Sequence, residues 1–464
     1  MLRSLLVFSI LIPGVVLACT SRYRALLLYL WFAFFRPQDW MWFDITSFRP
    51  SLFLGLLLVV PAVLTGVMPT LGHFLCVGSV LFVLAALAAQ VTAVNQAVGW
   101  YWIDEVGRLI LICLFAVTVI KTPRDWMRAV AVIAASLGFY GIKAGLASLL
   151  AGGAMYAQGL GGAFSDNNGY ALAVVMVMPL IALVGQNGQV AFEGLLPSWT
   201  SRWIRIACFV SLPLCAYTVV STFSRAGFLA LLAALAAWVA FHPRRLRIFF
   251  AVAAISFAAT FVPLPKGYMD RLGTIAPAVQ GGQVDARPDQ DVSEGRLYFW
   301  TIAMRMARDH PFGVGMRNFQ SAFPAYDVTG GAYGENRDVH SSHFQVLAEL
   351  GYPGLLIWVA MFSYGFWVAF RVKRRGRVAT LTPSVAHLFA TAPVALIASM
   401  TGFLVGGSFI SGALNDLTWV TFALLAALDR MSARAVLGPE KAVAPAYKPP
   451  VRQAQYSTRG AVNG

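Results

Sequence analysis

The sequence predicts an all-α integral membrane protein with twelve or thirteen transmembrane helices and one large, partly helical periplasmic loop. Of its 464 residues, 58% are hydrophobic and only 12% are charged, which leaves too little polar surface to cover a water-soluble domain. Apolar runs of about 16 to 25 residues, the length that crosses a bilayer as a helix, recur along nearly the whole chain. A transmembrane β-barrel would instead show short segments of alternating polarity.

Thirteen apolar segments are the candidate membrane spans. The first follows Arg3 and ends at Cys19, as a signal peptide would, but Arg22 and another apolar run follow at once, so we interpret it as a membrane helix. The first two segments are short enough to form a re-entrant or oblique pair, so the count is twelve or thirteen. The segments are residues 5–19, 23–35, 50–68, 72–93, 106–121, 127–150, 168–185, 203–222, 226–242, 247–263, 352–371, 385–408 and 412–430.

The distribution of basic residues predicts the orientation of these helices. A formal net charge of +15 would be compatible with nucleic-acid binding. However, the basic residues form short clusters between apolar runs, as is typical of cytoplasmic loops beside anionic lipids, so we expect no nucleic-acid partner. The clusters occupy alternate connections, at residues 121–128, 202–205, 244–247 and 371–377. The intervening connections then face the periplasm, which places the protein in a bacterial inner membrane with its long loop outside.

The chain divides into four regions on this reading. Residues 1–262 form an N-terminal transmembrane region, 263–351 the periplasmic loop, 352–430 the C-terminal transmembrane helices, and 431–464 a disordered cytoplasmic tail. The loop is far longer than ordinary connections and should carry structure and function. Within it, Glu294–Asp309 predicts a helix, and His343–Leu350 predicts a short one that runs into the next span. The apolar stripe of the first helix is predicted to comprise Leu297, Trp300, Ile302, Met304 and Ala307.

Two arginines on the outward side are candidate anion-binding residues. Arg225 lies in a very short connection between two apolar helices, where it would either snorkel from a helix end or contact an anionic headgroup. Arg296 lies at the start of the predicted loop helix, where a guanidinium group and a helix N-terminus together suit a phosphate. The alternative for Arg296 is an ordinary salt bridge with Glu294 or Asp291.

Two histidines, His340 and His343, lie just before the helix that re-enters the membrane. They could be metal ligands, but no third ligand is apparent and the five cysteines contain no Cys-x-x-Cys pair, so we expect no metal. A neutral imidazole is well suited to take a proton from an attacking hydroxyl group. Asp338 or Glu335 could orient such a base.

The segment Asp166-Asn167-Asn168 stands at a predicted outward helix start. These residues are explained by helix capping, and a sugar or phosphate contact is the second interpretation. Two outward arginines and a histidine, without a nucleotide-binding glycine loop or a serine elbow, suit group transfer from a lipid-linked phosphate. The arginines would hold the diphosphate in place of a divalent cation, while the histidine deprotonates the acceptor.

These residues resemble the bacterial O-antigen ligase and O-antigen polymerase family, including its exosortase-associated O-glycosylation ligases. In that family, the histidine stands five residues before a glutamine and nine before a glutamate, which selects His340 and leaves His343 an auxiliary candidate. By this resemblance, Arg225 and Arg296 match the arginines that bind the lipid diphosphate, and His340 matches the catalytic base. The resemblance covers about residues 160–430 and rests on Ser165-Asp166-Asn167-Asn168, Thr222-Phe223-Ser224-Arg225-Ala226-Gly227, Gly295-Arg296-Leu297-Tyr298-Phe299-Trp300, His310-Pro311-Phe312-Gly313-Val314-Gly315 and the run from His340 to Gly351.

The resemblance implies an O-antigen ligase-type glycosyltransferase that moves a glycan from undecaprenyl diphosphate to lipid A-core on the periplasmic side, without a metal or another cofactor. The single base predicts inversion at the anomeric carbon. The alternatives are an O-antigen polymerase or a protein O-glycosylation ligase, whose acceptor is another glycan or a protein. A secondary transporter or flippase would show internal repeats and ionisable groups at mid-membrane, and the sequence has no convincing repeat. The expected partners are the lipid-linked donor, the acceptor and membrane lipids.

Overall fold

The computed structural model describes residues 2–42, 44–153, 157, 166–259, 292–334, 337–378 and 380–437. Within these ranges the secondary structure is helical, without strands, and each of the thirteen predicted apolar segments contains a helix. These helices are α1 (Leu2–Ala18), α2 (Arg22–Phe35), α3 (Pro50–Leu64), α4 (Phe74–Gln90), α5 (Gln96–Val119), α6 (Pro123–Leu150), α7 (Asn167–Phe192), α8 (Thr200–Ser221), α9 (Arg225–Phe241), α10 (Arg245–Ala259), α15 (Ser342–Arg375), α16 (Pro383–Gly407) and α17 (Asp416–Leu437).

Several of these helices have the properties of membrane spans. In the described part of the chain, six helical segments are long and apolar enough to cross a bilayer, which indicates a membrane protein. The number of crossings, twelve or thirteen, stays a prediction. The six are Thr46–Leu64, which includes α3, then α6, α7, α8, α15 and α16.

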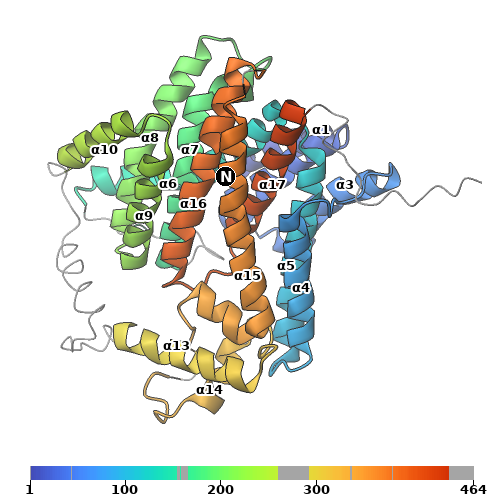
Figure 1. Cartoon of the computed structure of the whole chain (residues 1–464), viewed down its shortest axis with the longest axis vertical. Helices are drawn as coiled ribbons and strands as arrows, with labels where there is room; N and C mark the ends of the chain where they lie inside the picture. The colour runs from blue at the N-terminus through green and yellow to red at the C-terminus, as the bar shows by residue number, and fades with distance from the viewer. Residues whose placement is uncertain are drawn as a thin grey trace, which may run out of the picture.

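The helices form a bundle, and the loop before α15 lies at one end of it (Figure 1). Helix α16 packs on α7 and α9, and α15 packs on α4, α16 and α17. Two loop helices, α13 (Val292–Asp309) and α14 (Phe319–Tyr326), lie at one end of the bundle, and α13 runs across it. We call this the loop end. The fold therefore brings the starts of α9, α15 and α7 toward the same loop helices.

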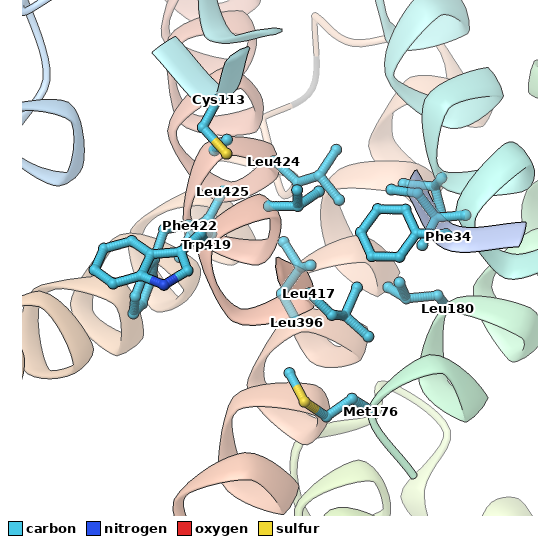
Figure 2. Close-up of a cluster of buried hydrophobic side chains, with 14 of the residues drawn as sticks. Phe34, Cys113, Met176, Leu180, Leu396, Leu417, Trp419, Phe422, Leu424 and Leu425 are labelled. Carbon is cyan, nitrogen blue, oxygen red and sulfur yellow. The ribbon is translucent and has the colours of Figure 1, made fainter. Parts of the chain in front are cut away.

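The interior of the bundle is built from apolar side chains of most of its helices. Figure 2 shows Phe34 of α2, Met176 of α7, Leu396 of α16 and Leu425 of α17 converging in one cluster, and each of these side chains is buried. Lipid tails are as apolar as these side chains, so the helices associate through close van der Waals packing rather than through the hydrophobic effect. This packing gives the loop end a fixed scaffold.

The basic connections predicted to share one side of the membrane lie together at the other end of the bundle. Arg128 Nε at the start of α6 donates to the carbonyl of Ala191 at the end of α7, over 2.8 Å. Lys373 Nζ near the end of α15 donates to the Phe241 carbonyl at the end of α9. These contacts agree with the predicted alternation of the connections. That this end is cytoplasmic stays a prediction.

Helix α15 contains a sharp kink at Gly351, where φ is 66° and ψ is −165°. The two parts of α15 on either side of this kink correspond to the predicted short helix, His343–Leu350, and the predicted span, residues 352–371. The turn after α13 packs its backbone against the kink: Val314 N donates to the Ala348 carbonyl over 2.9 Å, and Tyr352 N donates to the Pro311 carbonyl over 3.0 Å. A Cβ atom on Gly351 would lie 2.0 Å from the Pro311 oxygen. The kink therefore requires glycine for conformation and for space.

The Gly351→Ala variant should be markedly less stable than the wild type. The backbone conformation alone should cost about 1–3 kcal/mol for a residue other than glycine, and the clash with Pro311 adds to this. The midpoint of thermal unfolding in detergent measures the effect. Gly107→Ala in α5 is the matched control, because no atom lies within 4 Å of its added Cβ and helical alanine is favourable. An unchanged midpoint in Gly351→Ala would contradict the proposed role of the kink.

The buried side of α13 differs from the predicted stripe. Phe299, Ile302 and Met306 are buried, whereas Leu297 and Met304 are 56% and 43% exposed. Residues 299, 302, 303 and 306 follow the i, i+3, i+4, i+7 spacing of one helical face, and Leu297 and Met304, seven residues apart, share the opposite one. The predicted stripe was wrong at these two positions because it mixed the two faces.

Two further features differ from the sequence prediction. Helix α14 was not predicted, since it has only eight residues and contains Pro324. Helix α17 continues to Leu437 and so includes the first seven residues of the predicted tail. Residues 438–464 of the tail and residues 260–291 of the loop lie outside the described residues.

Candidate active site

The N-termini of α7 and α9 are closed by side-chain caps. The Asp166 carboxylate accepts a hydrogen bond from Gly169 N over 2.9 Å, and Ser224 Oγ accepts one from Gly227 N over 3.0 Å. Each cap satisfies a backbone N–H that has no partner within its helix. The capping interpretation of Asp166 is thus confirmed. Ser165, the residue before it, lies outside the described residues.

The two capped ends are also bound to each other. Ser224 Oγ donates to Asn168 Oδ1 over 2.7 Å, and Asn167 Nδ2 donates to the carbonyl of Thr222 over 2.9 Å. Phe223 between these contacts has a φ of 54°, a conformation that residues other than glycine rarely adopt. Asn167 and Asn168 therefore hold the turn that presents Arg225, the first residue of α9. Their predicted contact with a sugar or phosphate stays a prediction.

Arg225 and Arg296 lie close enough to repel each other. Burial is the main cause that lowers the pKa of Arg296 to about 10, and the charge of Arg225 is the second cause. Arg296 is therefore still protonated at neutral pH. Its Nε is buried without a hydrogen-bond partner, and none of the described side chains forms an ion pair with Arg296. The alternative partners, Glu294 and Asp291, lie outside the described side chains.

His340 is held in a strained conformation next to α13. Its φ is 51°, in the left-handed region that disfavours residues with a Cβ. Its backbone N–H donates to Ser411 Oγ over 3.0 Å, and its ring centroid lies 6.1 Å from that of Phe299. Such strain persists only where neighbouring contacts impose it, and it is common at functional sites.

The imidazole of His340 is surrounded by charged groups from three predicted motifs. Burial lowers its pKa, Asp338 raises it, Arg296 lowers it and Asp166 raises it, and the net pKa lies below the ordinary value of 6.5. His340 is therefore neutral at neutral pH. Asp166 at the start of α7 and Arg296 on α13 are among the charges that act on this imidazole. The structure thus brings Asp166, Arg225, Arg296 and His340 into one region at the loop end.

His343 has a different environment from His340. Its Nδ1 accepts a hydrogen bond from Trp358 Nε1 over 3.1 Å, and its Nε2 lies 3.1 Å from the carbonyl of Leu404. Since Nδ1 accepts, Nε2 carries the proton and donates to that carbonyl. One ring nitrogen thus binds Trp358, farther along α15, and the other binds Leu404 of α16, which favours a structural role for His343.

The glutamine and glutamate that set the register of the His340 motif have structural partners. Glu349 is buried and its Oε2 accepts a hydrogen bond from Arg317 N over 2.8 Å. Gln345 Nε2 lies 3.2 Å from the same carboxylate, and Gln345 Oε1 accepts from Ala413 N over 3.3 Å. These residues join the first turns of α15 to two neighbouring loops.

Of the two carboxylates considered as orienting groups for His340, only one can be described. Asp338 lies 3.9 Å from Arg317 Nη1 and raises the pKa of His340 through its charge. Glu335 lies outside the described residues.

The connection between α16 and α17 contributes residues that the sequence reading missed. Ser411 binds the backbone of His340, the carbonyl of Ile410 accepts from Ser342 Oγ over 2.7 Å, and the ring of Phe409 lies 5.8 Å from Arg296 Cζ. Single residues in an outward connection carry no motif, and only their position between two helix ends could have drawn attention to them. The described residues contain no group of three or more His, Cys, Asp or Glu side chains that could hold a metal ion.

The fold and this site define a helical membrane protein with an arginine- and histidine-containing site at the loop end of its bundle. Residues 210–359, about a third of the chain, match the model of a family described as O-antigen ligase. The matched segment contains Arg225, Arg296 and His340, and it supports the predicted relation to O-antigen ligases and polymerases. This family indicates a glycan-transfer function and implies lipid-linked glycan substrates. No curated protein gave a significant match to the chain.

Proposed function

We propose that the chain is an O-antigen ligase-type glycosyltransferase, which transfers a glycan from undecaprenyl diphosphate to lipid A-core on the periplasmic side of the inner membrane. The observation that carries this proposal is Arg296, whose charge acts on the neutral His340 and on which the charge of Arg225 acts in turn. This arrangement lies within the segment that matches the O-antigen ligase family. The buried Nε–H of Arg296 has no hydrogen-bond partner in the described part of the chain, which favours an anionic ligand, and the diphosphate of a lipid-linked donor has that chemistry.

The proposed reaction is a single displacement at the anomeric carbon. Nε2 or Nδ1 of neutral His340 takes the proton of an acceptor hydroxyl, and the hydroxyl oxygen forms a bond to the anomeric carbon. The bond between that carbon and the diphosphate oxygen breaks, and undecaprenyl diphosphate leaves with the electron pair. Arg225 and Arg296 stabilise the charge that develops on the leaving oxygen, a task that a divalent cation performs in other enzymes. Attack from the face opposite the leaving group inverts the configuration.

The acceptor distinguishes the members of this class. An O-antigen polymerase would use a second lipid-linked glycan, and a protein O-glycosylation ligase would use a protein hydroxyl, with the same chemistry at the donor. The test is to incubate purified protein with a labelled undecaprenyl-diphosphate glycan and each acceptor class separately. Labelled lipid A-core supports the proposal, and labelled polymer or protein would assign one of the alternatives. Movement of intact donor across a vesicle membrane without transfer to any acceptor would contradict it and favour a flippase.

The pH dependence of transfer should reflect the lowered pKa of His340. A general base works only in its unprotonated form, and the buried His340 gains its proton below the ordinary imidazole pKa of 6.5. The pH at which transfer falls to half of its maximum should therefore lie below 6.5. The rate measured at saturating donor between pH 5 and 8 checks this. A half-maximal rate reached above pH 6.5 would contradict a base with a lowered pKa.

A further inference from the structure

Trp300 places a second unpartnered donor on the side of α13 that carries Arg296. The two residues are four positions apart, so their side chains lie on one helical face. Arg296 Nε and Trp300 Nε1 are both buried, and neither has a hydrogen-bond partner in the described part of the chain. Buried donors in folded proteins are normally paired, because an unpaired one loses its hydration without compensation. Two such donors one turn apart point to a ligand that accepts from both.

Aromatic neighbours fix the position of the Trp300 ring. The ring stacks on that of Phe344, with centroids 5.1 Å apart and planes 16° apart. The ring of Phe409 lies 6.4 Å from Trp300 and 5.8 Å from Arg296 Cζ, so both donors border the same aromatic side chain. Phe344 lies four residues after His340, and Phe409 lies two residues before Ser411, which binds His340. The indole N–H is therefore held between the elements that build the proposed active site.

We propose that Trp300 is a further ligand of the donor diphosphate, and that its Nε1–H donates a hydrogen bond to a phosphate oxygen. This inference rests on the proposed function. A diphosphate offers several acceptor oxygens and can satisfy Arg296 and Trp300 together. An indole group only donates and carries no charge. It thus adds a hydrogen bond to the anion without adding to the repulsion between Arg225 and Arg296.

Binding of undecaprenyl diphosphate to the purified full chain in detergent tests this inference. The variant Trp300→Phe keeps an aromatic ring against Phe344 and removes the N–H. It should bind undecaprenyl diphosphate about 10-fold more weakly, as expected for the loss of one hydrogen bond to a charged group. A second replacement of Trp300, by benzothienylalanine, keeps both rings with sulfur in place of the N–H. It should weaken binding equally even if Trp300→Phe is poorly folded.

Trp419→Phe is the matched control. The indole Nε1 of Trp419 is likewise buried without a partner, but its ring packs against Phe82 and Trp358 within the bundle. Removing this N–H should leave the affinity for undecaprenyl diphosphate unchanged. An equal loss in both variants would overturn the assignment of Trp300, because it would then be a general effect of removing an indole.

The remaining outcomes separate this inference from the proposed function. A wild-type chain that does not bind undecaprenyl diphosphate overturns both. If the wild-type chain and Trp300→Phe bind undecaprenyl diphosphate equally tightly, the assignment of Trp300 is overturned while the proposed function stands. If Trp300→Phe weakens binding of the glycan-linked donor but not of undecaprenyl diphosphate itself, Trp300 contacts the sugar and the diphosphate assignment is wrong.

Discussion

Replacing His340 by alanine should lower the rate of glycan transfer about 100- to 10,000-fold, the usual contribution of a positioned general base. The neutral imidazole is the group that would accept the hydroxyl proton, and its lowered pKa keeps it unprotonated at neutral pH. Donor binding should change little, because the diphosphate is assigned to the arginines. Single-turnover transfer and donor affinity, measured on the same preparation, check both parts.

His343→Gln is the matched control for this variant. The imidazole of His343 binds Trp358 and the Leu404 carbonyl, so the change should lower the thermal midpoint while the folded fraction still transfers glycan. Full activity in His340→Ala would remove His340 as the base. Loss of activity in folded His343→Gln, with activity retained in His340→Ala, would reassign the base to His343.

Replacing Arg296 by alanine should lower transfer about 100- to 1,000-fold, as the loss of one preorganised donor to a developing negative charge does in other enzymes. The variant should also bind the donor more weakly, since Arg296 contributes both charge and an unpaired Nε–H. Arg296→Lys should recover part of the activity only, because lysine keeps the charge but lacks the planar pair of donors. Initial rates at several donor concentrations separate the effect on kcat from that on KM.

Arg305→Ala on the same helix is the control for the loss of charge. Arg305 is exposed, and nine residues after Arg296 it lies on the opposite side of α13. Its removal should leave transfer near the wild-type rate. Equal losses in Arg296→Ala and Arg305→Ala would show that α13 needs only its overall positive charge, and would contradict a specific diphosphate contact.

The sequence was sufficient to predict all the described α-helices except α14 and to select the candidate site residues. Hydrophobic runs long enough to cross a bilayer are a strong signal, because backbone groups in lipid must be paired within a helix. Arg225, Arg296 and His340 could be identified because each stands as a polar residue beside the start of an apolar or amphipathic helix. Their order along the chain fits a family pattern that the match over residues 210–359 supports.

Other features depend on tertiary contacts that no local pattern encodes. The positive φ of His340 is imposed partly by Ser411, seventy-one residues later in the sequence. The difference between His340 and His343 became apparent only from the partners of each ring. The wrong stripe on α13 has a similar cause, because several apolar residues occur on both of its faces and only the packing selects the buried one.

Transfer by the purified wild-type chain, with undecaprenyl-diphosphate glycan and lipid A-core in a buffer containing a chelator, tests the central claim most directly. We predict that glycan is transferred to lipid A-core at the same rate with and without the chelator, because the arginines neutralise the diphosphate. Transfer that stops in chelator and returns with a divalent cation would contradict this account of the site. Absence of transfer under both conditions, by folded protein, would contradict the assignment of lipid A-core as the acceptor.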